Sequence, residues 1–483
     1  MKSQLTLGDI LQIENAIDIS RLCCPDTGIP LWSTIRNSVL RMIVGDMHYS
    51  VSLTGNSDHS HSGSRLRQMT SISRSIAHNA VKSRSLKPRY PILLMATGAR
   101  VTMRDTGYFN DLSGYFVETA PRRTYAIEDL FDWKWPFPRH DNNVLLHAPL
   151  RVEGVLKGKL RTGRFREPAR TLVELVSQRA KNGIGWDIGK KRRQWLEKLC
   201  TNGAASLLPR YRRYQTIFKK MGTQVLIKEE ACYGGADNAS AILAARNLGI
   251  VTAEYQHGTV SSSHIGYNFS TEMSRSEAYR QTLPEYFLTY GSWWGEQINA
   301  PVKKITIGNP HRTENLGFTS SLRANGRRIL VLGDGIETTI YLEFCERLAA
   351  ALGNIAEVIF RPHPLERASV LAKHPEMFVG KVRVDAHKDI YSSFLEAEAV
   401  VSEVSTGLFE AIGLVPKVFI WNTSKARFSF PLHPFQVISD ASELAQLVLD
   451  KSTGQVSMHQ IEDIWAPNWR RNYLDFIDMV VPR

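Results

Sequence analysis

Residues suited to acid–base chemistry follow an apolar run that begins at Ile250. The segment Glu254-Tyr255-Gln256-His257-Gly258 places a histidine before a glycine at the expected end of a strand. An imidazole held there can face a reacting hydroxyl, and its near-neutral pKa suits a general base. A hydrogen-bonded structural histidine beside a turn glycine would give the same pattern. We predict His257 as the base, with Glu230 and Asp237 as reserve bases.

Two later segments carry side chains that suit an anion. Arg361-Pro362-His363-Pro364 follows an apolar run, and its prolines stiffen a turn from which the arginine and histidine can donate hydrogen bonds. Ser405-Thr406-Gly407 precedes a predicted helix, where free backbone N–H groups and the helix dipole attract anions. Glu410, about one turn later, could accept from ribose hydroxyls. A solvated proline-rich connector and simple helix capping are the alternative interpretations.

A glycine turn completes the set of candidate anion-binding residues. Gly333-Asp334-Gly335 follows the apolar run 328–332, and glycine lets a ligand approach the backbone closely, although a tight turn explains it as well. The sequence thus predicts a nucleotide-phosphate site made of Gly335, Arg361, His363, Ser405, Thr406 and Glu410.

The elements that must position these residues alternate between apolar runs and helical segments. In the first alternation strands are predicted near 225–227, 250–251, 287–288 and 305–307. A polar passage at 309–327 interrupts the pattern, and a second alternation predicts strands at 328–332, 358–360, 382–384, 400–401 and 418–420. This βαβ rhythm predicts an α/β fold of two Rossmann-like, doubly wound domains, residues 1–315 and 316–483, that face a ligand-binding cleft. That architecture is typical of the GT-B fold.

The first two hundred residues carry a weaker pattern. Strands are predicted at 92–95 and 144–146, an aromatic-rich loop region lies between them, and helical periodicity without strands runs from about 171 to 220. A helix is predicted near 33–44 and a polar loop at 54–64. The His59-Ser60-His61 sequence in that loop is assigned no role.

The charge of the chain favours anionic partners. Its 60 Lys and Arg against 47 Asp and Glu give a formal net charge of +13, which attracts nucleic acid, acidic glycan, nucleotide phosphate or a membrane surface. Basic residues are concentrated at 157–220, and those at 190–220 form either a solvated helix face or a peripheral contact with anionic membrane. No basic stripe with interleaved aromatics is present, so nucleic acid is not predicted as a partner.

The cysteines and the hydropathy favour a cytoplasmic protein at the inner face of the cell membrane. The five cysteines show neither C-x-x-C spacing nor an even framework, which fits a reducing compartment. No run approaches the roughly 20 apolar residues that a membrane helix needs, so membrane contact is expected to be peripheral.

The order of the motifs resembles that of bacterial GT-B enzymes of capsule, lipopolysaccharide and teichoic-acid synthesis. His257-Gly258 and Arg361–His363 match motifs of the CDP-glycerol glycerophosphotransferases, whose serine-rich phosphate motif corresponds to Ser405-Thr406. His363-Pro364 and Ser405-Thr406 match motifs of the bacterial sialyltransferases and Kdo transferases. The resemblance covers residues 225–436 by motif order.

This resemblance implies transfer of a sugar from a nucleotide-activated donor to a surface polysaccharide or glycolipid acceptor. His257 would deprotonate the acceptor, the anomeric centre would invert, and Arg361, His363 and the Ser405-Thr406 turn would stabilise the leaving phosphate. No Asp-x-Asp element is present, so neither a metal nor another cofactor is predicted. A polyol-phosphate phosphotransferase using the same histidines is the alternative enzyme, and a basic nucleic-acid-binding protein is the second alternative.

Overall fold

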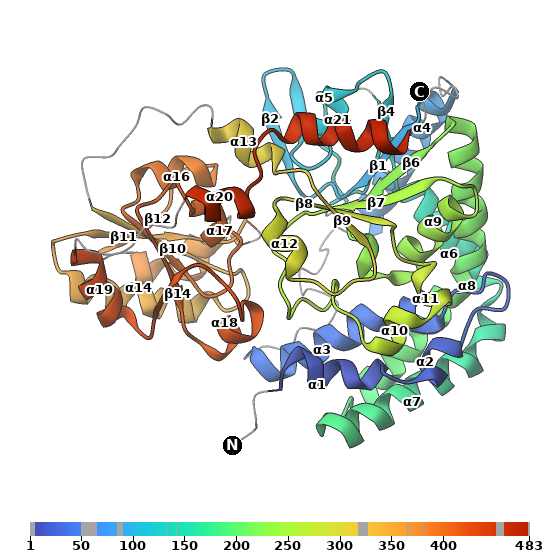
Figure 1. Ribbon diagram of the computed structural model, residues 1–483, viewed down its shortest axis with the longest axis horizontal. Helices are drawn as coiled ribbons and strands as arrows, with labels where there is room; N and C mark the ends of the chain where they lie inside the picture. The colour runs from blue at the N-terminus through green and yellow to red at the C-terminus, as the bar shows by residue number, and fades with distance from the viewer. Residues whose placement is uncertain are drawn as a thin grey trace.

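Two parallel sheets form the framework of the molecule (Figure 1). The computed structural model describes residues 5–49, 65–84, 90–131, 133–141, 143–316, 327–364, 366–367, 369–378, 380–450 and 458–481. Each sheet has helices on both faces, which confirms the predicted α/β fold of two Rossmann-like domains in a GT-B arrangement.

The first sheet has seven parallel strands in the order β5-β4-β1-β6-β7-β8-β9. Their bounds are β1 Ile92–Ala96, β4 Thr124–Glu128, β5 Val144–Leu146, β6 Val225–Lys228, β7 Val251–Tyr255, β8 Tyr286–Thr289 and β9 Lys303–Thr306. The loop region predicted between the strands at 92–95 and 144–146 is not all loop, because it contains β4 and a hairpin of β2 Val101–Arg104 and β3 Gly107–Asn110. All five β4 residues are buried, so the strand has no alternation of polar and apolar side chains to reveal it.

The second sheet has six parallel strands in the order β12-β11-β10-β13-β14-β15. Their bounds are β10 Arg328–Leu332, β11 Glu357–Arg361, β12 Val382–Val384, β13 Ala399–Ser402, β14 Lys417–Trp421 and β15 Gln436–Ile438. The helices of this part of the chain are α14 Thr338–Leu352, α15 Val370–Lys373, α16 Ile390–Glu396, α17 Gly407–Ala411, α18 Ser424–Ser429 and α19 Ala441–Leu449. The switch in strand order at β10 and β13 leaves the crevice in which doubly wound sheets bind ligands.

The predicted helical region at 171–220 is two helices. α7 Arg166–Ile184 and α8 Lys190–Met221 are separated by Gly185 and Gly189, which have φ angles of +67° and +74°. These left-handed conformations favour glycine, and they let the chain reverse so that α7 packs against α8. The other helices before the second sheet are α1 Leu7–Leu11, α2 Ile17–Arg21, α3 Arg36–His48, α4 Arg65–Arg84, α5 Gly114–Thr119, α6 Ala148–Lys159, α9 Gly235–Arg246, α10 Thr271–Arg275, α11 Glu277–Arg280, α12 Ser292–Glu296 and α13 Pro310–Leu316.

A buried ion pair joins the N-terminal helices to the first sheet. The Arg36 guanidinium contacts Glu14 at 2.6 Å with both side chains fully buried, and it also donates to the carbonyl oxygens of Ile265 and Asn268. The predicted helix at 33–44 exists as α3, three to four residues later than expected. The predicted loop at 54–64 lies outside the described residues.

The C-terminal helices lead back to the first domain. α20 Met458–Ile464 is followed by α21 Trp469–Val480, whose Trp469 and Tyr473 pack against Phe116 of α5 (Figure 1). The division predicted at residues 315 and 316 falls at the end of α13 and stays a prediction. α21, which that division gives to the second domain, lies on the first.

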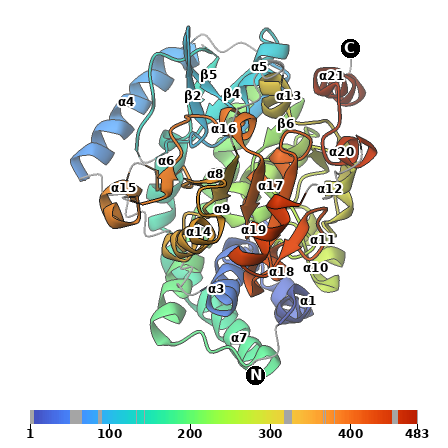
Figure 2. The same ribbon diagram turned by 90° about the vertical axis from the view of Figure 1, so that its left-hand side faces the viewer.

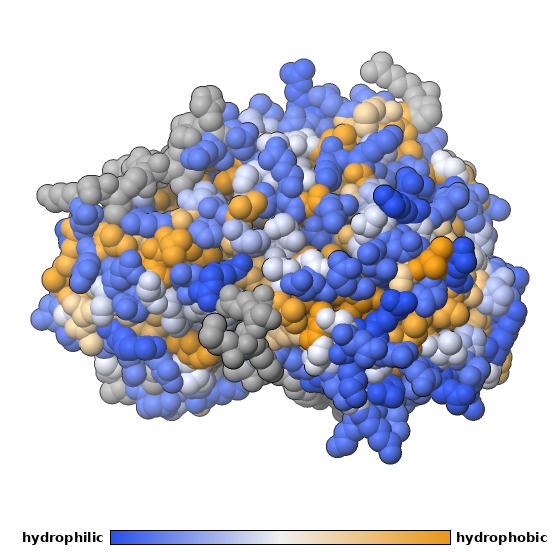
Figure 3. All heavy atoms as spheres, turned by 60° about the horizontal axis from the view of Figure 1, so that its bottom comes forward, coloured by the Kyte–Doolittle hydropathy of each residue, from blue (hydrophilic) through white to orange (hydrophobic). Residues whose placement is uncertain are grey.

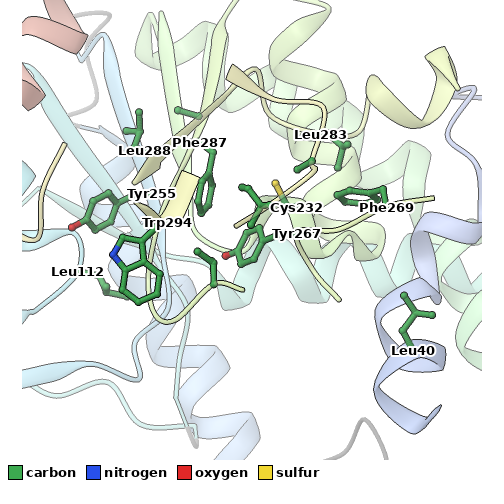
Figure 4. Packing of buried hydrophobic residues seen from close by; sticks show 14 of the residues in the cluster. Leu40, Leu112, Cys232, Tyr255, Tyr267, Phe269, Leu283, Phe287, Leu288 and Trp294 are labelled. Carbon is green, nitrogen blue, oxygen red and sulfur yellow. The ribbon is translucent and has the colours of Figure 1, made fainter. Parts of the chain in front are cut away.

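The apolar core beneath β7 and β8 is rich in aromatic side chains. Tyr255, Tyr267, Phe287 and Trp294 belong to one buried cluster, which Figure 4 shows from close by. On the face that Figure 3 shows, hydrophilic residues predominate and hydrophobic residues lie in patches between them. None of the described helices is both long and apolar enough to cross a membrane.

Candidate active site

The carboxyl ends of β1, β4 and β6 surround a cavity of about 490 Å³ in the first domain. The residues that line it come from these strand ends, from α6, α8 and α9, and from α3 with the turn before it, and they include Thr97, Asp129, His147, Lys228, Glu230 and Asp237. Strand ends of a parallel sheet are where this class of fold binds its ligands. The cavity brings two of the predicted bases, Glu230 and Asp237, to one place.

His257 lies at the edge of this cavity, immediately after β7. Its side chain is 15% exposed, and its Nε2 atom is 3.8 Å from Glu230 Oε1, so the two predicted bases are neighbours. Two tyrosines flank the ring: Tyr233 Oη is 3.4 Å from Nε2, and Tyr267 Oη is 3.4 Å from Nδ1. The ring is thus held in one orientation from both sides.

A chain of hydrogen bonds orients the His257 ring. Tyr267 donates its hydroxyl proton to Glu254 at 2.7 Å, so its oxygen is free to accept from Nδ1–H of His257. Glu254 is fully buried and also accepts from the backbone N–H of Cys232 at 2.7 Å. This assignment leaves Nε2 as the basic atom, which is the tautomer that a general base needs.

Burial keeps His257 neutral. Loss of solvent, together with the positive charges of Arg100 and His264, lowers the pKa of His257 to about 3. The imidazole is therefore neutral at physiological pH but only weakly basic, which differs from the near-neutral pKa expected from the sequence. An anionic ligand beside Arg100 would cancel part of this effect and raise the basicity of the ring.

Two buried glutamates titrate near neutrality. Burial raises the pKa of Glu254 to about 7, against hydrogen bonds from Cys232 and Tyr267 that favour its ionised form. Burial likewise raises the pKa of Glu229 to about 7, against a hydrogen bond from the Thr97 backbone N–H. Neither was singled out from the sequence. Glu254 lies inside a buried strand, where the apolar neighbours conceal its connection to His257.

Glu230 has a strained backbone. Its φ angle is +58°, a left-handed conformation that is uncommon for a residue with a side chain. Burial of its surroundings raises the pKa of the carboxyl, although the side chain itself is 52% exposed. Such strain at a strand end commonly marks functional positions.

Asp237 is engaged by positive charges. Arg210 Nη1 lies 2.5 Å from its carboxylate, the Tyr214 hydroxyl donates to it at 2.7 Å, and His147 Nε2 is 3.4 Å away. Burial alone would raise the pKa of Asp237, but the charges of His147, Arg210 and Lys228 outweigh burial and hold it well below its usual range. A carboxylate so stabilised is a weak base. Its contacts hold Arg210, Tyr214 and His147 together at the wall of the cavity.

Arg100 is a cleft residue that the sequence did not reveal. It follows β1 and is exposed, and a Cβ atom added to Gly258 would lie 4.0 Å from its Nη2. It forms no salt bridge with a carboxylate of the described residues. The only feature of the sequence that indicates Arg100 is its place two residues after Gly98, the glycine that follows the predicted strand. An exposed guanidinium beside His257 is suited to an anionic ligand.

In the second domain Gly335 and His363 lie against each other. Gly335 has a φ angle of +72°, and a Cβ atom there would lie 2.8 Å from the Cβ atom of His363. Only glycine fits this contact. The turn after β10 and the turn after β11 are therefore packed together, as the sequence predicts for two parts of one site.

Lys425 joins three buried carboxylates beside the same turn. Its Nζ atom lies 2.7 Å from Asp334, 2.7 Å from Glu337 and 2.5 Å from Glu403. Burial lowers the pKa of Lys425, but the charges of Asp334 and Glu403 outweigh it and raise the pKa above its ordinary value. These three carboxylates are the only group with the spacing of metal ligands among the described residues, and the ammonium group already contacts all three.

Arg361 is held inside the second domain. Its guanidinium contacts Asp385, donates to Ser393 Oγ at 2.9 Å, and donates to the carbonyl oxygens of His387 at 3.1 Å and Lys388 at 3.2 Å. These contacts hold the loop after β12 in place. A phosphate ligand would have to bind the Arg361 guanidinium in addition to these partners. His363, two residues later, is the member of the motif that lies against the Gly335 turn.

Ser405, Thr406 and Glu410 lie at the start of α17. Ser405 Oγ accepts from the Gly407 backbone N–H at 3.1 Å, and the Thr406 hydroxyl makes no capping bond to the helix. Burial and the nearby charge of Glu410 both raise the pKa of Tyr391 of α16. The predicted site residues of the second domain therefore gather at the ends of β10, β11 and β13.

The two groups of residues approach each other at Tyr290, which follows β8. Burial raises the pKa of Tyr290, and the charges that also act on its hydroxyl come from Arg100 and Glu229 in the first domain and from Glu410 in the second. Tyr290 is thus near charged side chains of both domains.

Comparisons with known proteins give likeness in structure only. No protein-family model and no curated protein sequence matches the chain. The UDP-GlcNAc 2-epimerase of Methanocaldococcus jannaschii, in complex with UDP-GlcNAc and UDP, is similar to 80% of this chain and 99% of its own, with 12% identity and a TM-score of 0.41.

Two other solved structures show likeness of the same order. The wall teichoic acid polymerase TagF is similar over 86% of this chain and 93% of its own, with 9% identity and a TM-score of 0.38. The glycotransferase of kitacinnamycin is similar over 82% of this chain and 100% of its own, with 13% identity and a TM-score of 0.41. Likeness at this level does not assign an activity.

Proposed function

We propose that the chain is a glycosyltransferase that moves a sugar from a nucleotide-activated donor to a bacterial surface polysaccharide or glycolipid acceptor. The observation that supports this most is the neutral His257, oriented through Tyr267 by Glu254 at the edge of the first-domain cavity. Across the cleft lie a glycine turn and hydroxyl residues of the kind that hold phosphate. Such a pairing suits transfer between a hydroxyl acceptor and a phosphorylated donor.

In the proposed reaction the acceptor hydroxyl gives its proton to His257 Nε2 as its oxygen attacks the anomeric carbon. The bond between that carbon and the nucleotide phosphate oxygen breaks, and its electron pair stays on the phosphate. Arg100 and His363 stabilise the departing charge, and the Glu230 carboxylate, 3.8 Å from Nε2, stabilises the imidazolium that forms. Attack from the face opposite the phosphate inverts the anomeric centre.

The first-domain cavity is the proposed acceptor site. Its lining carries both signs of charge and several hydroxyl and amide groups, including Ser38, Asp129, His147, Arg151 and Asn238. A surface of mixed donors and acceptors suits a polyhydroxylated ligand, whose hydroxyl groups both donate and accept.

The nucleotide is expected to bind the second domain through His363. Replacing His363 with Ala should weaken nucleotide binding by about 1.5–3 kcal/mol, the range for a hydrogen bond to a charged group. Isothermal titration calorimetry would measure this, with His433→Ala as a control in the same domain, because His433 accepts a turn hydrogen bond from Phe435. Unchanged affinity in a folded His363 variant would show that the nucleotide binds elsewhere.

The reaction class is tested by product analysis with CMP-, CDP-, UDP- and GDP-linked donors. A new glycosidic bond and release of nucleotide support the proposal. A phosphodiester in the product would instead identify a polyol-phosphate phosphotransferase, and a donor recovered with an altered sugar and no acceptor product would identify an isomerase. Either result would overturn the glycosyltransferase proposal.

The Glu254 pKa predicts a pH profile. Glu254 must be ionised to accept the Tyr267 proton, so kcat/KM should fall as pH falls through about 7, the pKa that burial gives this carboxyl. The His257 pKa of about 3 adds no step above pH 5. Glu254→Gln should lower kcat/KM and remove the step. Glu229→Gln is a matched control, because Glu229 also titrates near 7 without contacting Tyr267. A step that disappears in Glu229→Gln and persists in Glu254→Gln would contradict this assignment.

A further inference from the structure

Helix α4 is attached to the first domain through its polar side. Asn79 donates to the Leu146 carbonyl oxygen and accepts from the Leu146 backbone N–H, both at 2.8 Å. The His78 ring contacts the Val144 carbonyl oxygen at 2.9 Å, and Ser71 donates to the Trp133 carbonyl oxygen at 2.5 Å. These contacts cover the free edge of β5, the outermost strand of the sheet.

The opposite side of α4 is apolar and faces solvent. Leu66, Met69, Ile76 and Val81 are 73%, 66%, 52% and 68% exposed. A helix that merely packed on the domain would bury such residues and expose its serine, asparagine and histidine. In Figure 2, α4 lies at the outer edge of the first domain, away from the second sheet. α4 thus turns its polar side toward the domain and its apolar side toward solvent, which is the reverse of an ordinary surface helix.

The neighbouring loop adds aromatic residues to the same surface. Phe131 and Phe137 are 40% and 73% exposed, and Trp133 has a strained φ angle of +56°. Between this loop and α4 lies a groove of about 720 Å³, whose lining includes Arg67, Arg74, Lys134, Trp135 and Phe137. Exposed aromatic rings and basic side chains therefore share one surface, here called the α4 surface, made of Leu66, Met69, Arg74, Ile76, Val81, Phe131 and Phe137.

The charge of α4 limits what can cover this surface. Its sequence, RLRQMTSISRSIAHNAVKSR, contains five Lys or Arg residues and neither Asp nor Glu. A second copy of the chain meeting it symmetrically would bring like charges together. A nucleic acid would satisfy the charges and leave the apolar side chains without a partner. An anionic bilayer meets both, because its phosphates attract the basic groups and its acyl boundary accepts the apolar ones.

We propose that the α4 surface docks the protein on an anionic phospholipid bilayer. This differs from the membrane contact that the sequence suggests at 190–220, where part of the charge is engaged by carboxylates of other helices: Arg192 contacts Asp46 of α3, Arg210 contacts Asp237 of α9 and Arg213 contacts Glu153 of α6. Leu146 lines the groove beside α4, and the next residue, His147, lines the first-domain cavity. Docking would therefore bring that cavity close to lipid-linked acceptors, a consequence that rests on the proposed function.

Vesicle sedimentation of the full chain tests the docking surface. Binding to vesicles of phosphatidylcholine with phosphatidylglycerol should exceed binding to phosphatidylcholine alone and should fall as salt rises. A variant with Met69→Glu, Arg74→Glu and Ile76→Glu changes only exposed side chains and should bind the anionic vesicles at least about tenfold more weakly. A matched control with Lys190→Glu and Lys191→Glu, exposed at the start of α8, should bind them like the unmodified protein.

Two further measurements separate docking from folding and from activity. Circular dichroism should show the same melting transition for the α4 variant and the control. Transfer to a water-soluble acceptor should be equal in both. Vesicle sedimentation does not depend on this reaction, so its result stands even where no transfer is detected. Three results would each overturn the proposal. The unmodified protein could bind neutral and anionic vesicles equally, it could bind neither, or binding could be lost in the α8 control and kept in the α4 variant.

Discussion

Replacing His257 with Ala is expected to lower turnover by about 10²–10⁴-fold and to leave donor affinity nearly unchanged, the usual result of losing a general base. The ring is held between Tyr233 and Tyr267 with its Nε2 atom toward Glu230, so its removal takes away the proton acceptor and leaves the second-domain turns intact. Single-turnover rates measure the first quantity and calorimetry with nucleotide the second.

His264→Ala is the matched control for this experiment. His264 also has a pKa lowered by burial, to about 4, and its Nε2 atom lies 3.1 Å from Tyr233 Oη, the same hydroxyl that contacts His257. It should retain most of the turnover. If His257→Ala is folded and turns over normally, the base must be Glu230, which lines the cavity itself. If His257→Ala loses donor binding and keeps its rate, His257 belongs to the nucleotide site.

Replacing Lys425 with Met should abolish nucleotide binding and destabilise the fold by about 3–5 kcal/mol, the range for breaking a buried ion pair by removing one partner. Three carboxylates from the β10 turn, the segment before α14 and the end of β13 would then face one another without a cation. Their repulsion would separate the Gly335 turn from the Ser405-Thr406 segment. Denaturant unfolding and calorimetry measure the two effects.

Two further variants make the Lys425 result specific. Lys425→Arg keeps the positive charge and should recover part of both stability and nucleotide binding. Lys381→Met removes an exposed lysine of the same domain, whose Nζ atom only donates to the Gly353 carbonyl oxygen, and should change neither. Equal nucleotide affinity in Lys425→Met and in the unmodified protein would remove the role assigned to the buried cluster.

The sequence was most informative where elements are regular. The strands 328–332 and 382–384 have in the structure the bounds predicted for them, because each is a short apolar run bounded by glycine or charged residues. β4 escaped notice because it is short and buried on both faces. The break between α7 and α8 was missed although Gly185 and Gly189 mark it, since helical periodicity continues on both sides.

The candidate site was only partly accessible from the sequence, because a side chain's chemistry depends on what lies beside it. His257 and Glu230 were named as separate candidates, and only the fold brings them to 3.8 Å. Asp237 looked equally basic until the structure placed Arg210 against it. Arg100 and Lys425 stand in ordinary surroundings in the sequence. Only the fold brings Arg100 near Gly258 and places Glu403 against Lys425.

The path of the chain between the domains limits how they can move. It crosses from the first domain to the second between α13 and β10 and returns between α20 and α21, and the crossings are adjacent because Trp469 Nε1 donates to Glu314 at 3.1 Å. The two domains also share buried packing away from these crossings, because Phe409 of α17 lies against Trp293 and Trp294 of α12. On α3 and α18 the His48 and Phe428 rings stack at 4.0 Å between centroids. Any separation of the domains would have to break both of these contacts, so the shared packing favours the arrangement that the structure shows.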